Sequence, residues 1–220
     1  MEEIVKFDQI VGSTVALQGR PFENRACPDQ YVGTLAEVCS RPTFPYRLPI
    51  DRRTANPCLI LVLESPHIDE FIDTPGPAKG FTGEMIRKHL SEAYDLTGWL
   101  EYGLILLNAI QFQCSLGSNT AVYRDRIFRA TWIQGGRENF QSRLQASYRL
   151  GDQIMNCCTK GNDFEINPPL RSLVENAIRQ VNPTIQTIKR MHPAAWRDPA
   201  WRGKAWRHVE PVIDSTSHVN

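Results

Sequence analysis

"CLILVLE" at residues 58–64 decides the fold, because it is a short unbroken apolar run rich in branched residues. Such a run is typical of a strand buried on both faces of a sheet. "GLILLNAI" at residues 103–110 predicts a second buried strand, and "TIQTIK" at residues 184–189 predicts a third. Between these runs, apolar residues recur at helical spacing. We therefore expect an α/β fold with three layers, α/β/α, around a central, mostly parallel sheet.

Five helices are predicted from apolar spacing and from residues that favour helix starts. The predicted helices span residues 82–96, 121–131, 136–156, 168–181 and 198–209. The last of them, "DPAWRGKAWRHV", would begin with Asp198 as its N-cap and Pro199 in its first turn.

The chain is long enough to bury one sizeable core, with 220 residues of which 41% are apolar. Residues 1–56 are rich in Pro, Gly, Arg and polar residues and predict an irregular N-terminal wrap, with one helix near residues 29–39. Residues 57–208 carry the strand and helix pattern and predict the core. We expect residues 1–220 to form a single domain, and the protein to be a monomer.

The formal net charge of +1 hides an uneven distribution of charge along the chain. Residues 189–208 carry six Lys or Arg against one acid, and residues 121–150 carry six Arg against two acids. These segments total +5 and +4, so the rest of the chain carries about −8. Two basic segments on an otherwise acidic protein predict a localised polyanion site. For either segment alone, a solvated helix face is the simpler interpretation.

No targeting or membrane signal is visible in the sequence. The N-terminus, "MEEIVKFDQIVGS", lacks both a basic start and a long apolar stretch, and no run approaches the length of a membrane span. The six cysteines form no CxxC pair and are expected to be reduced. We expect a cytoplasmic protein with no membrane partner.

Each predicted strand ends in a segment with reactive or hydrogen-bonding side chains, and parallel strands bring such ends to one edge of a sheet. Asn108 closes the second strand and is a turn former by itself, but its amide pairs a donor with an acceptor and suits the edge of a pyrimidine. His192 precedes Pro193, which suits an abrupt strand exit. At that edge His192 could donate a hydrogen bond to an oxygen that gains negative charge.

The segment "ESPHIDEF" after the first strand supplies Glu64, His67, Asp69 and Glu70. Such a loop is solvated surface, a divalent-cation site, or a source of a carboxylate that positions water or stabilises a positively charged sugar. Phe81, between glycines in "GPAKGFTG", could cover a planar ligand or pack in the core.

Together these roles describe the excision of a base from DNA. Extracting a base from duplex DNA costs a few kcal/mol, and side-chain wedges in the base stack help to offset that cost. Trp196, flanked by Arg197, is the expected wedge, and Trp201 and Trp206 are expected to anchor the last helix to the sheet. Arg197, Arg202 and Lys204 are the expected DNA-binding cations.

These motifs resemble those of the uracil-DNA glycosylase superfamily, most closely its bacterial and archaeal iron–sulfur branches (families 4 and 5). "LESPHIDEF" followed by "GPAKGFTG" is similar to the family's first motif, "LILLNAI" to its strand ending in Asn, and "HPAAWR" to its last motif. Their order agrees over about residues 57–208. The resemblance implies hydrolysis of an N-glycosidic bond that leaves an abasic site, with double- or single-stranded DNA as the partner.

By position, the resemblance implies one role for each motif residue. Phe81 would be the stacking ring, Asn108 the base reader, His192 the leaving-group stabiliser and Trp196 the intercalating residue. Glu64 and Ser65 occupy positions that bind or activate water in various branches.

Three departures concern the pocket. Ser65 stands where the best-known branch has its catalytic aspartate, and Leu63 replaces a glycine. His67 occupies a position that helps to exclude bulky 5-substituents, so the pocket could take a base larger than uracil, such as a modified cytosine of phage DNA, in a defence role.

The resembled branches hold an iron–sulfur cluster on four cysteines. Cys114, with Cys157 or Cys158, lies near the expected positions, but no CxxC pair is present near the N-terminus. Buried free thiols are the simpler account, so we expect no cofactor and no metal.

Two other functions compete with a DNA glycosylase for a modified or damaged pyrimidine. One is a metal-dependent phosphoesterase or nuclease that uses His67, Asp69, Glu70 and Asp73. The other is a DNA-binding module without turnover.

Overall fold

A computed structural model describes residues 7–16, 21–163 and 168–208 of the chain. Five strands form one sheet in the order β1-β3-β2-β4-β5. The strands are β1 (Gln30–Thr34), β2 (Cys58–Leu63), β3 (Gly103–Asn108), β4 (Gln153–Asn156) and β5 (Thr187–Lys189). β1 runs antiparallel to β3 at one edge, and the other four strands are mutually parallel. The expected mostly parallel sheet is confirmed.

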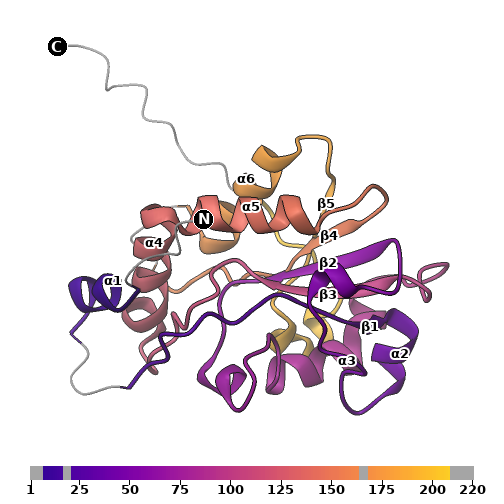
Figure 1. Cartoon of the computed structure of the whole chain (residues 1–220), viewed down its shortest axis with the longest axis horizontal. Coiled ribbons are helices and arrows are strands. Elements are labelled where there is room, and N and C mark those ends of the chain that lie inside the picture. Colours follow the sequence, from indigo (N-terminus) through magenta and orange to yellow (C-terminus); the bar gives the residue numbers. More distant parts are fainter. Residues whose placement is uncertain (1–6, 17–20, 164–167, 209–220) are drawn as a thin grey trace.

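Helices cover both faces of the sheet, as Figure 1 shows. On one face lie α4 (Ile127–Thr131), α5 (Arg137–Ser147) and α6 (Leu170–Val181), and α1 (Phe7–Thr14) packs against α4. On the other face lie α2 (Leu35–Ser40) and α3 (Phe81–Ala93). The expected three-layer α/β fold is therefore confirmed.

The apolar runs of β2 and β3 form the centre of the core. Every residue of both strands is buried. Because successive side chains of a strand point to opposite faces, Ile60 and Val62 join the cluster under α5 and α6, while Leu59 and Leu61 join the cluster under α3. An unbroken apolar run is needed where both faces of a strand are covered.

The helix predicted over residues 136–156 is wrong in its last third, where the structure has a turn and β4. α5 ends at Ser147, and Gly151 adopts a positive φ of 93°. The Asp152 carboxylate accepts hydrogen bonds from the backbone amides of Arg149 and Cys58, which ties the turn to the start of β2. With four residues, β4 is too short to display a strand periodicity of its own.

The N-terminal wrap predicted for residues 1–56 contains more regular structure than expected. Within the helix expected near residues 29–39, the chain forms β1 and then α2. Thr34 separates the two with a capping box, in which its side chain accepts from the Glu37 amide and Glu37 bonds back to Thr34. Part of this segment is therefore an edge strand of the sheet.

The closing helix predicted over residues 198–209 is absent from its described part. Two short 3-10 helices, Pro193–Arg197 and Pro199–Trp201, are followed by a turn and then by irregular chain up to residue 208. Asp198 does act as an N-cap, because its carboxylate accepts from the Ala200 amide, but the helix ends within one turn. Gly203 follows with a φ of 67°, which no right-handed helix accommodates. None of the described helices has the length and apolarity needed to cross a membrane.

Candidate active site

The main candidate site lies where the chain reverses its direction across the sheet. From β2 the chain passes through α3 to β3 on one side, and then through α4 and α5 to β4 on the other side of β2. The carboxyl ends of strands at such a switch point form a crevice that commonly binds ligands. Here a cavity of about 270 Å³ opens at the end of β2. Its lining residues are Leu63, Glu64, Ser65, His67, Asp69, Glu70, Gly80, Phe81, Thr82, Ser115, Arg124 and His192.

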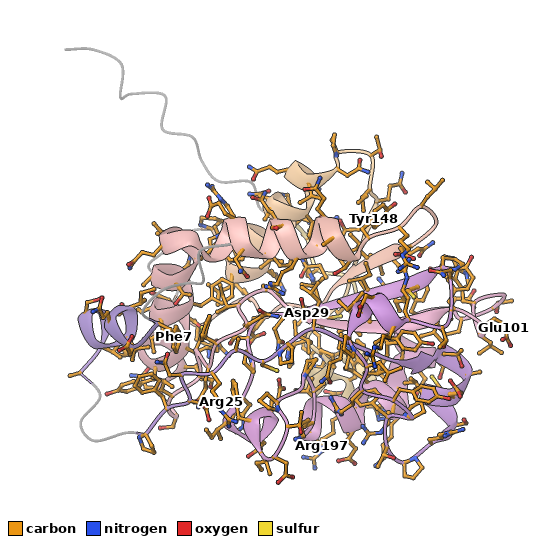
Figure 2. The ribbon with its side chains drawn as sticks, viewed as in Figure 1. Phe7, Arg25, Asp29, Glu101, Tyr148 and Arg197 are labelled. Carbon is orange, nitrogen blue, oxygen red and sulfur yellow. The ribbon has the colours of Figure 1, made fainter. Side chains whose placement is uncertain are left out.

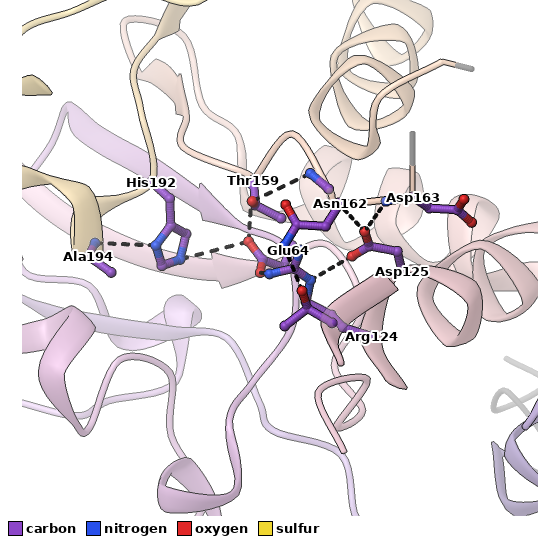
Figure 3. Close-up of polar contacts among 10 residues, drawn as sticks. Glu64, Arg124, Asp125, Thr159, Asn162, Asp163, His192 and Ala194 are labelled. Atoms are coloured by element: carbon purple, nitrogen blue, oxygen red, sulfur yellow. Dashed lines mark hydrogen bonds and ion pairs between the residues drawn. The ribbon is translucent and has the colours of Figure 1, made fainter. Parts of the chain in front are cut away.

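Glu64 and His192 meet in this cavity, as expected from the strand ends. Nε2 of His192 lies 3.7 Å from Oε2 of Glu64 (Figure 3). The same Glu64 oxygen accepts a hydrogen bond of 3.1 Å from the backbone amide of Thr159, which follows β4. Glu64 is only 8% exposed, so these contacts fix its carboxylate at the inner end of the cavity.

The surroundings of His192 determine which of its ring nitrogens carries a proton. Nδ1 accepts a hydrogen bond from the Ala194 amide at 3.2 Å, so in the neutral ring the proton sits on Nε2 and faces Glu64. Burial lowers the pKa of His192 below its ordinary 6.5, and Arg124 adds to that effect, while Glu64 opposes it. At neutral pH His192 is therefore an uncharged donor directed into the cavity.

Arg124 is a member of the site that the sequence analysis did not single out. Its Nη1 lies 3.9 Å from Oε1 of Glu64, and its Nε donates to Asp125 at 2.6 Å. Asp125 is fully buried and also accepts from the backbone amides of Asn162 and Asp163 (Figure 3). The only signal in the sequence was the arginine-rich segment 121–150, in which nothing distinguishes Arg124 from its neighbours.

Asn108, the expected base reader, lies behind the cavity wall and does not line it. It is 1% exposed, although β3 places it beside Leu63 at the end of β2. Glu70 lines the cavity, and its carboxyl interacts with the Asn108 side chain and the Ala78 backbone. Burial raises the pKa of Glu70 from 4.5 to about 8. The expected direct contact of Asn108 with a base is not found, because Asn108 is buried and does not line the cavity.

Two of the other expected residues stand at the mouth of the cavity. Phe81 is the first residue of α3 and is 48% exposed, so one face of its ring is available to a ligand. His67 is exposed, and its Nδ1 lies 3.2 Å from Oδ2 of Asp69. Both residues line the cavity and could contact a ligand that enters it.

Several buried polar atoms in and beneath the cavity make no hydrogen bond to any described residue. They are Ser65 Oγ, Glu70 Oε2, Asn108 Oδ1 and Arg124 Nη2. Leaving such an atom without a partner costs about 1–3 kcal/mol. Native interiors contain few such atoms, and a cluster of them calls for an explanation. Other such atoms belong to side chains elsewhere, among them Arg53 and Arg171, and these four lie at or behind the wall of the cavity that also holds Glu64 and His192.

Trp196 does not fit the predicted role of an exposed wedge. It is fully buried in the apolar cluster on the α3 side of the sheet. Trp201, which was expected to anchor a helix, is instead 37% exposed, and the Lys204 ammonium lies 4.3 Å from the centre of its ring. Trp206 does anchor the segment, since it is buried and donates to the Asn156 carbonyl.

The cations expected to bind DNA divide into two groups. Arg197 and Lys204 are exposed, and Figure 2 shows Arg197 at the outer edge of the molecule. Arg202 is committed to internal contacts, because it donates to the Trp196 carbonyl at 2.7 Å and to Glu92 at 2.6 Å. The expectation that Arg202 faces DNA is therefore wrong for this conformation.

The basic segment 121–150 does not form one surface patch. Arg129 is buried, and Arg143 pairs with Asp29 at 2.6 Å while donating to the carbonyls of Asn108 and Ala109. These arginines support the interior. Arg126, Arg137 and Arg149 are exposed, as are Arg197, Lys204 and Arg207 of the segment 189–208.

The cysteines do not match a four-cysteine cluster. Cys157 packs in the core on one face of the sheet, whereas Cys114 and Cys158 pack on the other face. Burial raises the pKa of each of these three thiols, which keeps them protonated.

The acidic loop of the metal-dependent hypothesis is also dispersed. Glu70 turns inward beside Asn108, while His67 and Asp69 are exposed. In the described part of the chain, no three His, Cys, Asp or Glu side chains come together in a group suited to a metal ion.

Comparison with known proteins leaves the family open. No family model matches the chain, and no curated protein or solved structure is significantly similar to it.

Proposed function

We propose that this chain is a DNA glycosylase that hydrolyses the N-glycosidic bond of a damaged or modified pyrimidine and leaves an abasic site. The observation that carries the proposal is the pairing of Glu64 with a neutral His192 whose Nε2 proton faces the cavity. A fixed carboxylate and a fixed neutral donor are the two groups that breaking a base–sugar bond requires.

In the proposed reaction, the bond between C1′ of the sugar and N1 of the base breaks, and its electron pair leaves with the base. His192 Nε2–H donates a hydrogen bond to O2 of the departing base and so stabilises the negative charge. The Glu64 carboxylate stabilises the positive charge on the sugar and orients a water molecule. The water oxygen bonds to C1′, and its proton passes to Glu64 and then to solvent.

The residues at the mouth of the cavity suit a flat ligand that enters from solvent. Phe81 could stack on the base, and the neutral Glu70 carboxyl offers a donor at the inner wall. The His67 side chain is exposed and makes its polar contacts with the nearby Asp69, so it could move aside for a substituent at C5. Uracil or a bulkier modified cytosine, as in phage DNA, is the proposed substrate, and defence against phage is the proposed setting.

Trp201 replaces Trp196 in the proposed contact with DNA. Trp201, Arg197 and Lys204 form an exposed aromatic and basic surface that continues from His192 along the chain. Aromatic stacking on an unpaired base and contacts of Lys or Arg with phosphate are general modes of DNA binding. A cytoplasmic location and a monomeric state remain part of the proposal.

Alkali-sensitive cleavage of labelled oligonucleotides tests the proposal. Wild-type protein is expected to make DNA with uracil or a 5-substituted cytosine alkali-labile, and Glu64→Gln and His192→Gln are expected to slow this strongly without losing DNA binding. Glu101→Gln is the matched control, because Glu101 is exposed and lies just before β3. It is therefore at the amino ends of the parallel strands, away from the cavity at their carboxyl ends (Figure 2). Binding without alkali-labile product from any substrate would favour a non-catalytic module. Phosphodiester cleavage abolished by EDTA would favour the metal-dependent phosphoesterase.

A further inference from the structure

We propose that Arg124 binds an anionic oxygen of the nucleotide held in the cavity. This inference rests on the proposed function for the identity of the ligand, but it concerns a residue to which neither the motifs nor the resemblance assigned a role. It is carried by the way in which Asp125 holds the Arg124 guanidinium beside Glu64.

One side of the guanidinium is fixed by the protein. Nε donates to Asp125, whose carboxylate is itself held by the backbone amides of Asn162 and Asp163. Asp125 is fully buried, and its carboxylate accepts hydrogen bonds from Arg124 Nε and from these two amides. It can therefore hold the arginine in one orientation. The Arg124 side chain is 14% exposed, so it is not a mobile surface group.

The terminal nitrogens of the guanidinium are not held in this way. Arg124 lines the cavity, and its Nη2, which is itself buried, makes no hydrogen bond to any described residue. Nη1 is 3.9 Å from Glu64, which is too long for a hydrogen bond. Two terminal nitrogens with unused donors, on a rigid planar fork, match two oxygens of a phosphate or one oxygen anion.

The position beside Glu64 limits which part of a nucleotide Arg124 can reach. In the proposed reaction Glu64 faces the sugar, and the sugar carries both the flanking phosphates and the bond to the departing base. An anionic oxygen beside Glu64 therefore comes either from a phosphate or from O2 of the base as it leaves. A phosphate oxygen and O2 of the departing base would both accept hydrogen bonds from Arg124. The two measurements below distinguish them.

The test compares Arg124→Gln and Arg124→Lys with Arg126→Gln. Arg126 lies two residues away on the same helical segment and is exposed, which makes it a matched control. Arg124→Lys keeps the charge and loses the fork, so it separates charge from geometry if Arg124→Gln unfolds. Thermal unfolding of every variant reports the cost of leaving Asp125 without its arginine.

The first measurement is independent of catalysis. Deoxyuridine monophosphate and inorganic phosphate are titrated against each protein and followed by thermal shift. If the source is a phosphate, both ligands stabilise the wild type and Arg126→Gln, and binding to Arg124→Gln is weaker by about ten- to a hundredfold. On duplex DNA, the slope of log affinity against log salt then falls by about one for Arg124→Gln only.

The second measurement is the single-turnover rate on DNA with leaving groups of different acidity. If the source is the departing base, Arg124→Gln slows excision of uracil more than that of 5-fluorouracil, whose anion needs less stabilisation, while the salt slope stays unchanged. Arg124→Gln that matches Arg126→Gln in ligand binding, salt slope and leaving-group dependence would overturn the inference. A wild type that binds the monophosphate through Arg124 but excises no base would instead refute the proposed function alone.

Discussion

Nε2 of His192 lies 3.7 Å from Oε2 of Glu64, although β4 separates the strand before His192 from the strand that ends at Glu64. The contact exists because β2, β4 and β5 are parallel and end at one edge. A donor and a carboxylate at this spacing can act on the two sides of one breaking bond.

The role of His192 predicts a specific dependence on pH. Because burial lowers the pKa of His192 below 6.5, the neutral donor persists as the pH falls to 6.5, and the excision rate should decline only at more acidic pH. His192→Gln should lower the single-turnover rate by about 10²–10³, the usual effect of removing an oxyanion donor. DNA affinity, measured by fluorescence anisotropy, should change little. A parallel loss of affinity and rate would contradict this role.

Glu70 predicts a loss of stability with rising pH. Its pKa is about 8 in the folded protein and near 4.5 in the unfolded chain, so the folded state holds a proton that the unfolded state has released between these values. Stability contributed by this group is complete below pH 4.5 and is lost as pH rises toward 8. Other charges near Glu70 are Arg47, which favours ionisation, and Glu64, which opposes it.

Glu70→Gln should remove this component. We expect the melting temperature of the wild type to fall between pH 6.5 and 8, and that of Glu70→Gln to fall less. This pH range lies above the lowered pKa of His192 and below the raised pKa of the buried Cys27 thiol. Titration of these two groups in the folded protein therefore adds little to the change in melting temperature. Identical slopes for the two proteins would show that Glu70 is ionised in the folded state.

The buried ion pair between Arg53 and Asp152 predicts a large effect on stability. The two side chains are fully buried and 2.8 Å apart, and Asp152 also accepts from the amide that begins β2. Removing one partner of such a pair costs about 3–5 kcal/mol, so Asp152→Ala should lower the free energy of unfolding by that amount. Chemical denaturation measures it, with the exposed Glu138→Gln on α5 as the control. A change below about 1 kcal/mol would mean that water replaces the missing carboxylate.

The two tryptophans of the basic segment should behave in opposite ways. Trp196→Ala empties a fully buried site and should destabilise the fold by about 3–5 kcal/mol. Trp201→Ala should leave the melting temperature nearly unchanged and weaken binding to duplex DNA more than to single strands. Denaturation and anisotropy distinguish the two effects. Weaker DNA binding by a fully folded Trp196→Phe, with Trp201→Ala unaffected, would restore Trp196 as the DNA contact.

The sequence was sufficient for the centre of the fold because β2 and β3 are covered on both faces and must be apolar throughout. It was not sufficient for β4, where four residues carry too little pattern. Parallel strand ends also predicted that Glu64 and His192 meet. That Asn108 is buried while Glu70 lines the cavity depends on how the loop of Glu70 folds back, and no local pattern encodes that.

Arg124 and Trp196 show a further limit of sequence patterns. Arg124 is one of six arginines in its segment, and it reaches the site only because the distant amides of Asn162 and Asp163 hold Asp125. Trp196 stands beside Arg197 and resembles an exposed pair, but the two turn in opposite directions within one 3-10 turn. Orientation of this kind follows from tertiary packing.

Arg143 joins Asp29 to the carbonyls of Asn108 and Ala109, and the Asn108 amide also reaches Cys27 at 3.8 Å. The segment that leads into β1 therefore packs behind the candidate site. A protein shortened to begin after residue 29 would keep Glu64 and His192 but would lose the contacts of Cys27 and Asp29 behind Asn108, so the unit that builds the site extends well upstream of the first motif.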